Sequence, residues 1–162
     1  MKNLKILLIF FFTLLLLMSA QSMTFADIYL NIPNVEGEAL DQDYVEWIDV
    51  DAYHFEYLST QISSGRKGMV EKTPLTITKH MDKSTPLLFN KLSRSESLGD
   101  IILVVTYNDG DRRNEFVRIT FTKAMVMSIS NSVKDEVPMD QIQFTFNSVK
   151  IEYQNGMSMF EE

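Results

Sequence analysis

LTITKHMDKSTPLLFNKL, residues 75–92, combines the pattern of a β-strand with the start of a helix. In residues 75–80 every second side chain shares a face, which is the period expected of a β-strand. One face carries Leu75, Ile77 and Lys79, and the other carries Thr76, Thr78 and His80. The stretch therefore begins as a strand.

A helix is predicted directly after this strand. Ser84 or Thr85 supplies a hydroxyl for an N-cap, and Pro86 suits the first helical turn because its φ is fixed and it has no N–H to satisfy. Leu88 and Leu92 then fall on one helical face. Phe89 lies beside this apolar face. The polar residues can face water, and the cations among them suit the C-terminal end of a helix: Asn90, Lys91 and Arg94.

The remainder of the chain alternates like strand, so one short helix should accompany an otherwise β-rich domain. Strands are expected at 27–32, 44–57, 100–107, 115–123, 142–146 and 149–153. Gly99 should end the helical region, 108–111 should be a hairpin turn, 131–140 a polar loop, and 147–148 a bulge where the apolar parity switches. The fold class is mainly β: a small β-barrel of two antiparallel sheets with one short α-helix at its side.

The strand expected at 44–57 carries bulky side chains on both faces. One parity is aromatic and acidic, and the other is largely aliphatic. Either the second face meets another subunit or lines a channel, or a bulge swaps the faces midway.

Composition limits the possible partners. The 162 residues carry a formal net charge of −7 and no cysteine. An acidic chain without clustered Lys or Arg is a poor partner for nucleic acid or anionic lipid, and the absence of cysteine excludes disulfides and thiol chemistry.

The N-terminal 26 residues have the layout of a secretory signal peptide. Lys2 and Lys5 precede an apolar run at 6–18, and cleavage fits after Ala20 or Ala26. An uncleaved anchor is the alternative, and a start at Met23 is a third possibility. The expected organisation is a leader or upstream extension at 1–26, one β-barrel domain at 27–153, and a frayed tail at 154–162, with no stable membrane association once the leader is removed.

Candidate catalytic and metal-binding residues are few. His54 and His80 are the two histidines, and no spacing brings their imidazoles together. Asp49 and Asp51 share a strand face as paired catalytic acids can, but acidic residues on a solvated or interface strand are far commoner. The segment 108–111 lacks the spaced ligands of a calcium loop. We therefore expect no catalytic residue, no metal site and no cofactor.

Residues 59–72 have no apolar period and are expected to form a long, mobile loop. Its centre is Ser63, Ser64, Gly65, Arg66, Lys67 and Gly68. This segment is basic, whereas the chain as a whole is acidic.

The order of these segments resembles the haemolysin-coregulated protein (Hcp) family, the tube proteins of bacterial type VI secretion systems. The resemblance covers about residues 27–153. It rests on DIYL (27–30), WIDV (47–50), LTITK (75–79), MDKSTPLL (81–88), FVRITF (116–121), VPMD (137–140), FTF (144–146) and VKIEY (149–153). The strand that runs into DKSTP and a helix is its most specific part.

The resemblance implies a structural, non-enzymatic subunit. Six copies would form a ring, rings would stack into a tube, and effectors could travel in its lumen. The implied partners are further copies of the chain and the sheath, spike and effector proteins of the system. The loop centred on 63–68 resembles the one by which one ring meets the next, and the helix would form a ring lining or a side wall.

The leader departs from the family pattern, because these proteins are delivered by the secretion machine from the cytoplasm. If Met23 is the start, the chain is cytoplasmic before export through the type VI system; if the leader works, the chain is periplasmic or exported. An exported monomeric β-barrel binding module is the alternative function, and a hydrolase based on Asp49, Asp51 and the histidines ranks third.

Overall fold

The structure is a computed structural model, and it describes residues 24–60, 69–109, 112–154, 156 and 158–161. Eleven strands and one helix are formed in this part of the chain. They are β1 (Thr24–Asn31), β2 (Ile48–Val50), β3 (Ala52–His54), β4 (Tyr57–Thr60), β5 (Met69–Lys72), β6 (Leu75–His80), α2 (Ser84–Ser93), β7 (Ser97–Asp109), β8 (Arg112–Lys134), β9 (Val137–Thr145), β10 (Val149–Tyr153) and β11 (Ser158–Glu161). No helix among the described residues is long and apolar enough to cross a membrane.

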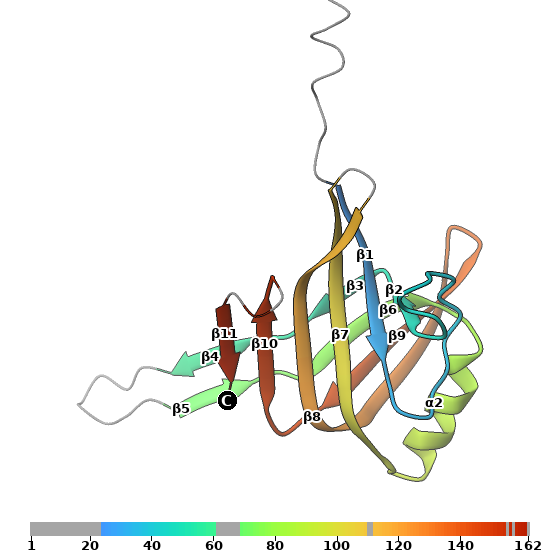
Figure 1. The fold of residues 1–162 in the computed structure, drawn as a ribbon. Coiled ribbons are helices and arrows are strands. Elements are labelled where there is room, and N and C mark those ends of the chain that lie inside the picture. The colour runs from blue at the N-terminus through green and yellow to red at the C-terminus, as the bar shows by residue number, and fades with distance from the viewer. Residues whose placement is uncertain (1–23, 61–68, 110–111, 155, 157, 162) are drawn as a thin grey trace, which may run out of the picture.

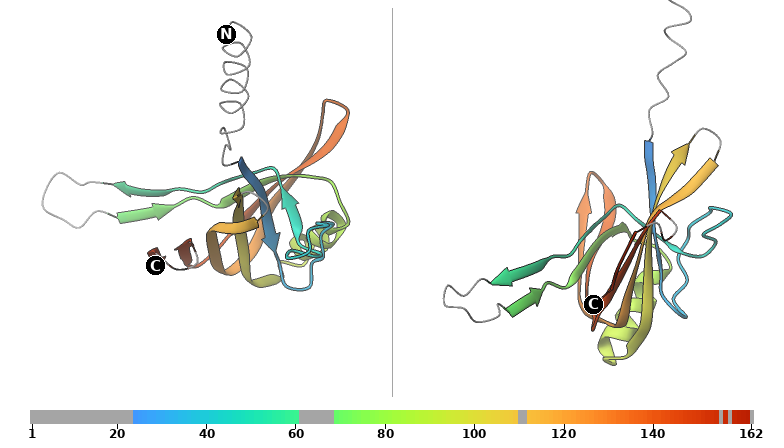
Figure 2. Two further views of the ribbon diagram at one scale, coloured as in Figure 1. Left: turned by 45° about the horizontal axis from the view of Figure 1, so that its top comes forward. Right: turned by 60° about the vertical axis from the view of Figure 1, so that its left-hand side comes forward.

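Two antiparallel sheets of unequal size make up the fold (Figure 1). The nine-stranded sheet follows the order β2-β1-β7-β8-β9-β6-β3, with β10 paired to β8 and β11 paired to β10. Strands β4 and β5 pair only with each other and project away from the body as an arm (Figures 1 and 2). The predicted mainly-β fold with two antiparallel sheets and one short helix is confirmed.

The large sheet curls around a single main core. Its end strands β2 and β3 follow each other in the chain with only Asp51 between them, and the Asp51 N–H donates to the Thr78 carbonyl at 2.8 Å. Inward residues of several strands, among them Ile77, Phe121 and Phe144, are fully buried, and Leu88 of α2 joins them. The predicted closed barrel, which would need continuous pairing between the two end strands, stays a prediction.

The single strand predicted at 44–57 is wrong. The chain instead forms three short strands that pair with different neighbours: β2 with β1, β3 with β6 and β4 with β5. Ile48 is buried on one parity, whereas Tyr53 and Phe55 pack on the core from the other. The faces swap at Asp51, so the second of the two explanations for bulk on both faces holds in the monomer.

Four segments expected to be irregular or helical are strands. Residues 131–134 and 137–140 form the end of a β8–β9 hairpin whose turn, Asp135 and Glu136, has positive φ at both positions. The tail contributes β11, and the outer parts of 59–72 form the β4–β5 arm rather than a mobile loop. Gly99 lies inside β7 at a register shift with φ +75°, because α2 already ends at Ser93.

Other predicted features are confirmed in part. Strands β7 and β8 form the predicted hairpin, and Ile119 and Phe121 of β8 are buried. The turn predicted at 108–111 is wrong at its first two positions, because Asn108 and Asp109 still pair in the ladder, and 110–111 lie outside the described residues. The inward residues Ile142, Phe144 and Phe146 are buried, and the parity then switches to Val149. The bulge predicted at 147–148 is instead a break: β9 ends at Thr145 and β10 begins at Val149, and the Asn147 N–H between them donates to the Thr122 carbonyl at 2.9 Å.

Candidate functional site

A buried lysine lies at the corner where β6 meets α2. The alternation of β6 places Lys79 on the same inward face as Leu75 and Ile77, and its side chain has no solvent exposure. Its Nζ donates to Asp82 Oδ1 at 2.6 Å, to Thr85 Oγ1 at 3.2 Å and to the carbonyl of His80 at 2.9 Å. Burying a charge is costly unless it is paired and hydrogen-bonded, and these contacts meet that requirement.

Asp140 of β9 completes this Lys79 cluster from a distant part of the sequence. Its Oδ2 lies 3.3 Å from Lys79 Nζ and accepts from Thr85 Oγ1 at 2.5 Å. Its Oδ1 accepts from Asn131 Nδ2 of β8 at 2.5 Å. The cluster therefore ties together the strand–helix corner and the β8–β9 hairpin, the segments that contain DKSTP and VPMD.

The sequence reading missed this cluster. The signal that could have revealed it is the position of Lys79 on the same strand face as Leu75 and Ile77, because a buried lysine needs buried carboxylates as partners. The cluster has a structural role, because each of its charged side chains already forms an ion pair with another member of the cluster.

The helix cap differs from the prediction. The N–H of Ser84 donates to Asp82 Oδ1 at 2.9 Å, and the Ser84 hydroxyl donates to the same oxygen at 2.5 Å. Thus the carboxylate of Asp82, rather than a hydroxyl of Ser84 or Thr85, accepts the first backbone N–H of the helix, and the N-cap position Lys83 makes no side-chain cap hydrogen bond. A carboxylate is also favoured there by the helix dipole.

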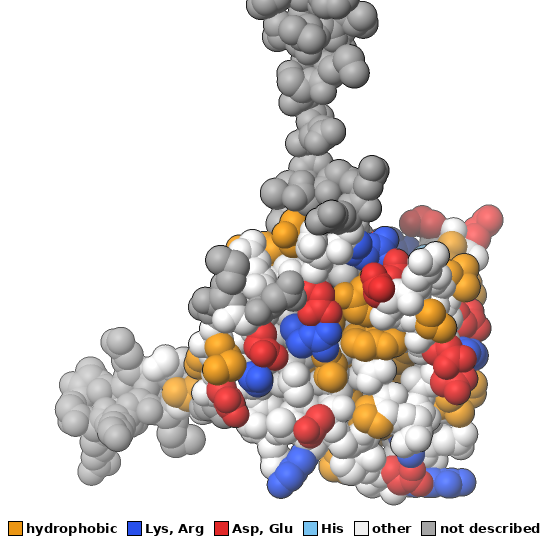
Figure 3. Space-filling model, in the orientation of Figure 1, with side chains coloured by type: hydrophobic (Ala, Val, Ile, Leu, Met, Phe, Trp, Pro, Cys, Tyr) orange, Lys and Arg blue, Asp and Glu red, His pale blue; other side chains and the backbone are white. Residues whose placement is uncertain are grey.

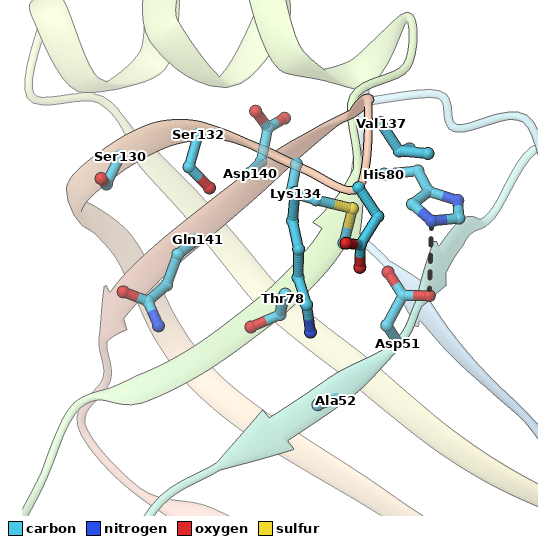
Figure 4. A pocket seen from close by; sticks show the side chains of 12 residues that line it. Asp51, Ala52, Thr78, His80, Ser130, Ser132, Lys134, Val137, Asp140 and Gln141 are labelled. Carbon is cyan, nitrogen blue, oxygen red and sulfur yellow. Dashed lines mark ion pairs between the residues drawn. The ribbon is translucent and has the colours of Figure 1, made fainter.

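The candidate acids Asp49 and Asp51 lie in an open groove of about 510 Å³ with Asp27 and His80. Asp49 is exposed, but partial desolvation in the groove raises its pKa, and the negative charges of Asp27, Asp82 and Asp51 raise it further, while His80 opposes them. His80 Nε2 lies 4.0 Å from Asp51 Oδ1, a contact drawn in Figure 4. The groove thus brings together carboxylates that repel one another, and the described residues of its lining include no serine, threonine or lysine that could act as a nucleophile.

The second groove on this side of the molecule, shown in Figure 4, has a volume of about 560 Å³. Ser130, Ser132, Thr78 and Gln141 give it a polar lining from β8, β6 and β9. It contains hydroxyl and amide groups beside His80 and so offers a hydrogen-bonding surface.

The two histidines are not brought together as a site. His54 is paired with Thr76 in the ladder and contacts Glu56 at 3.2 Å, whereas His80 lies at the other end of β6 opposite Met139. Within the described ranges no group of three or more His, Asp or Glu side chains is arranged to hold a metal ion.

The predicted ring-stacking residues, Ser63 to Gly68, lie outside the described residues. The strands that lead into them are described: Tyr57 pairs with Lys72 and Ser59 with Val70. Leu58 and Val70 are 47% and 55% exposed, so the arm presents apolar side chains to its surroundings.

Comparisons with known proteins agree on one family. The family model described as "Type VI secretion system effector, Hcp" matches residues 29–153. Protein hcp1 of Pseudomonas aeruginosa is 28% identical over 134 residues, which cover 79% of this chain and 83% of that protein.

Solved structures share the fold. Hcp1 from Salmonella typhimurium superposes with a TM-score of 0.70 at 24% identity, covering 85% of this chain and 93% of that one. The secreted protein Hcp3 from Pseudomonas aeruginosa gives a TM-score of 0.68 at 15% identity, covering 87% and 97%. With the family match spanning β1 to β10, the chain belongs to the Hcp family of type VI secretion system proteins.

Proposed function

We propose that this chain is a structural subunit of a type VI secretion tube: six copies form a ring, and rings stack head to tail. The observation that carries the proposal is the family match over residues 29–153. The projecting β4–β5 arm supports it, because a subunit that stacks needs a feature that reaches beyond its own body.

The proposed role is non-catalytic. Asp49 and Asp51 share their groove with a third carboxylate, Asp27, and with His80. Effectors would be carried in the lumen, the sheath and spike proteins would be further partners, and the assembled tube would leave the cell through the type VI machine.

The oligomeric state tests the proposal. Size-exclusion chromatography with light scattering should give six times the chain mass, and negative-stain electron microscopy should show rings. A strict monomer at high concentration would exclude the ring and favour the exported monomeric binding module. Mass spectrometry of the native N-terminus separates the two export routes: a terminus at Met23 or Thr24 supports cytoplasmic synthesis before secretion, and one at Gln21 or Asp27 supports a working leader.

The predicted stacking loop at 63–68 gives a second test of the same function. Deleting these six residues should leave rings intact and weaken their stacking, because the loop is proposed to contact only the next ring.

A further inference from the structure

The segment 36–47, which we name the platform, is built rigidly onto the body between β1 and β2. The Gly37 N–H donates to the Glu46 carbonyl at 2.7 Å, and the Ala39 N–H donates to the Trp47 carbonyl at 3.0 Å. A Cβ added at Gly37 would lie 2.3 Å from the Trp47 carbonyl oxygen, so this close approach needs glycine. The two ends of the platform are thus fastened to each other.

Buried aromatic packing fastens the platform to the sheet. Tyr44 is 6% exposed and stacks on Tyr29 of β1 with ring centroids 4.4 Å apart and planes 14° apart. Its hydroxyl donates to Glu115 of β8 at 3.1 Å, and Arg113 of β8 forms an ion pair with Asp41. The backbone of the platform is therefore held in place before any partner arrives.

This rigid backbone displays apolar and acidic side chains together. Leu40 is 96% exposed and Val45 is 60% exposed. Asp43 and Glu46 are exposed beside Val45, and no ion pair connects either carboxylate to a cationic side chain in the described part of the chain. Figure 3 shows hydrophobic and acidic side chains interspersed over the right-hand part of this face.

An apolar side chain held wholly in solvent on an ordered backbone is available for burial by a partner. An exposed leucine alone would need no explanation. Leu40 and Val45 instead stand on a braced segment, rimmed by uncompensated carboxylates, which is the anatomy of an apolar anchor with a charged rim. The chemistry fits a partner that brings apolar and basic groups.

The platform and the β4–β5 arm lie on opposite sides of the molecule. Figure 1 and both views of Figure 2 place the arm on one side of the curled sheet and the 36–47 segment on the other. A contact between the arm of one copy and the platform of another is therefore heterologous, and repeating it builds a ring or an open stack rather than a closed pair.

We propose that the platform is the acceptor for the arm of a second copy of this chain, with segment 61–68 of that copy as its occupant. This inference rests on the proposed function and names the partner of the stacking contact. The occupant reads QISSGRKG: Ile62 supplies an apolar group for Leu40 and Val45, and Arg66 and Lys67 supply cations for Asp43 and Glu46. Complementary charge of this kind fixes register and speeds encounter.

Matched substitutions in the full chain test the contact. L40S and the pair D43N/E46Q should each leave ring mass unchanged and weaken ring–ring association at least tenfold in sedimentation velocity. The controls are V133S, at an apolar position that is 73% exposed on the β8–β9 hairpin, and D135N/E136Q in the turn of that hairpin. These controls should stack like the unaltered chain.

Charge exchange gives a test that loss of folding cannot imitate. R66E/K67E and D43K/E46K should each abolish stacking, and the chain carrying all four substitutions should recover it, because each new contact again joins opposite charges.

Cysteine pairing locates the contact directly, since the chain has no cysteine of its own. The double variant L40C/S64C should form intermolecular disulfides in assembled tubes, seen as a ladder on a non-reducing gel. V133C/S64C should form no ladder above that of S64C alone.

The outcomes distinguish failure of the platform contact from failure of the proposed tube function. Rings that stack normally in L40S and D43N/E46Q, or a ladder no stronger in L40C/S64C than in its control, would overturn the platform as acceptor and leave the tube function standing. Unaltered rings that never associate would also overturn it. An unaltered chain that forms no ring would overturn the proposed function itself.

Discussion

At the scale of single residues, the Lys79 cluster shows how a charged group is kept inside a β-rich core. The lysine and Asp140 are both without solvent exposure, and Asp82 and Thr85 complete their contacts. A buried pair of this kind is tightly coupled, because removing one member leaves the other charged and unpaired.

Replacing Lys79 should therefore be far more damaging than replacing a surface lysine. Lys79→Met should lower the free energy of unfolding by about 3–5 kcal/mol, since Asp140 would remain buried without its cation. Urea denaturation followed by fluorescence of Trp47 measures the change.

Lys83→Met is the control for this prediction. Lys83 lies 3.4 Å from Glu36, and both side chains are well exposed at 43% and 62%. Surface pairs contribute about 0–1 kcal/mol, so this variant should unfold almost like the parent. Equal losses in the two variants would contradict a structural role for the Lys79 cluster.

Asp49 makes the stability of the folded chain depend on pH, and the direction of its raised pKa gives the sign of this effect. Partial desolvation and neighbouring carboxylates raise its pKa in the folded state above the usual 3.8, so the folded chain binds a proton there more tightly than the unfolded chain does. The group consequently lowers stability as pH rises above 3.8, and this cost is fully present once pH exceeds the raised pKa of the folded state.

Asp49→Asn should remove this cost. Its melting temperature should exceed that of the parent at pH 7, and the gain should disappear at about pH 3, where the carboxyl is protonated in both states. Asp43→Asn, an exposed position outside the groove, reports the general effect of losing one negative charge. A gain for Asp49→Asn that persists unchanged at the acidic pH would contradict the assigned cause.

At the scale of elements, the shape of the platform depends on one close backbone contact. Gly37 approaches the Trp47 carbonyl and the Ile48 Cα so closely that a Cβ would lie 2.3 Å and 2.5 Å from them. The neighbours are backbone atoms, so they cannot turn aside as a side chain would.

Gly37→Ala should therefore displace the platform. We expect a loss of about 1–3 kcal/mol in unfolding free energy, the usual cost of overpacking, and altered Trp47 fluorescence. Gln42→Ala, an exposed change in the same segment, should stay within about 0.5 kcal/mol of the parent. An unchanged Gly37→Ala protein would show that the two ends of the platform are not in close contact in solution.

At the scale of the whole molecule, the curled sheet separates an arm on one side from the platform on the other (Figure 2). This polarity is what a head-to-tail stack requires, because each ring must present different surfaces above and below.

Deletion of residues 63–68 should leave rings of the same mass and reduce ring–ring association at least tenfold. Negative-stain microscopy should show single rings where the parent forms longer stacks, and sedimentation velocity should give the ratio. V133S on the β8–β9 hairpin serves as the surface control. Unchanged stacking in the deletion would refute the loop assignment.

Stacking that depends on Arg66, Lys67, Asp43 and Glu46 should also be sensitive to salt. Raising the ionic strength from about 0.05 to 0.5 M shortens the screening length and should weaken ring–ring association in the parent. The D43N/E46Q variant should show a smaller dependence. Equal salt sensitivity in both would contradict an electrostatic contact at the platform.

The fold class and the order of most elements could be predicted from the residue pattern. Alternation over 75–80 located β6, Pro86 marked the first turn of α2, and the inward residues of β8 and β9 were identified by their period of two. These features are local, since side chains two or four positions apart already indicate which face of an element is apolar.

Features that depend on contacts between distant residues became clear from the three-dimensional fold. It broke 44–57 into three strands because each finds a different partner, and it paired the outer parts of 59–72 as an arm. It also brought Asp140 to Lys79 across 61 positions of sequence and turned 36–47 into a braced platform. Burial and pairing are properties of the assembled fold, and no pattern of neighbouring residues specifies which distant groups will meet.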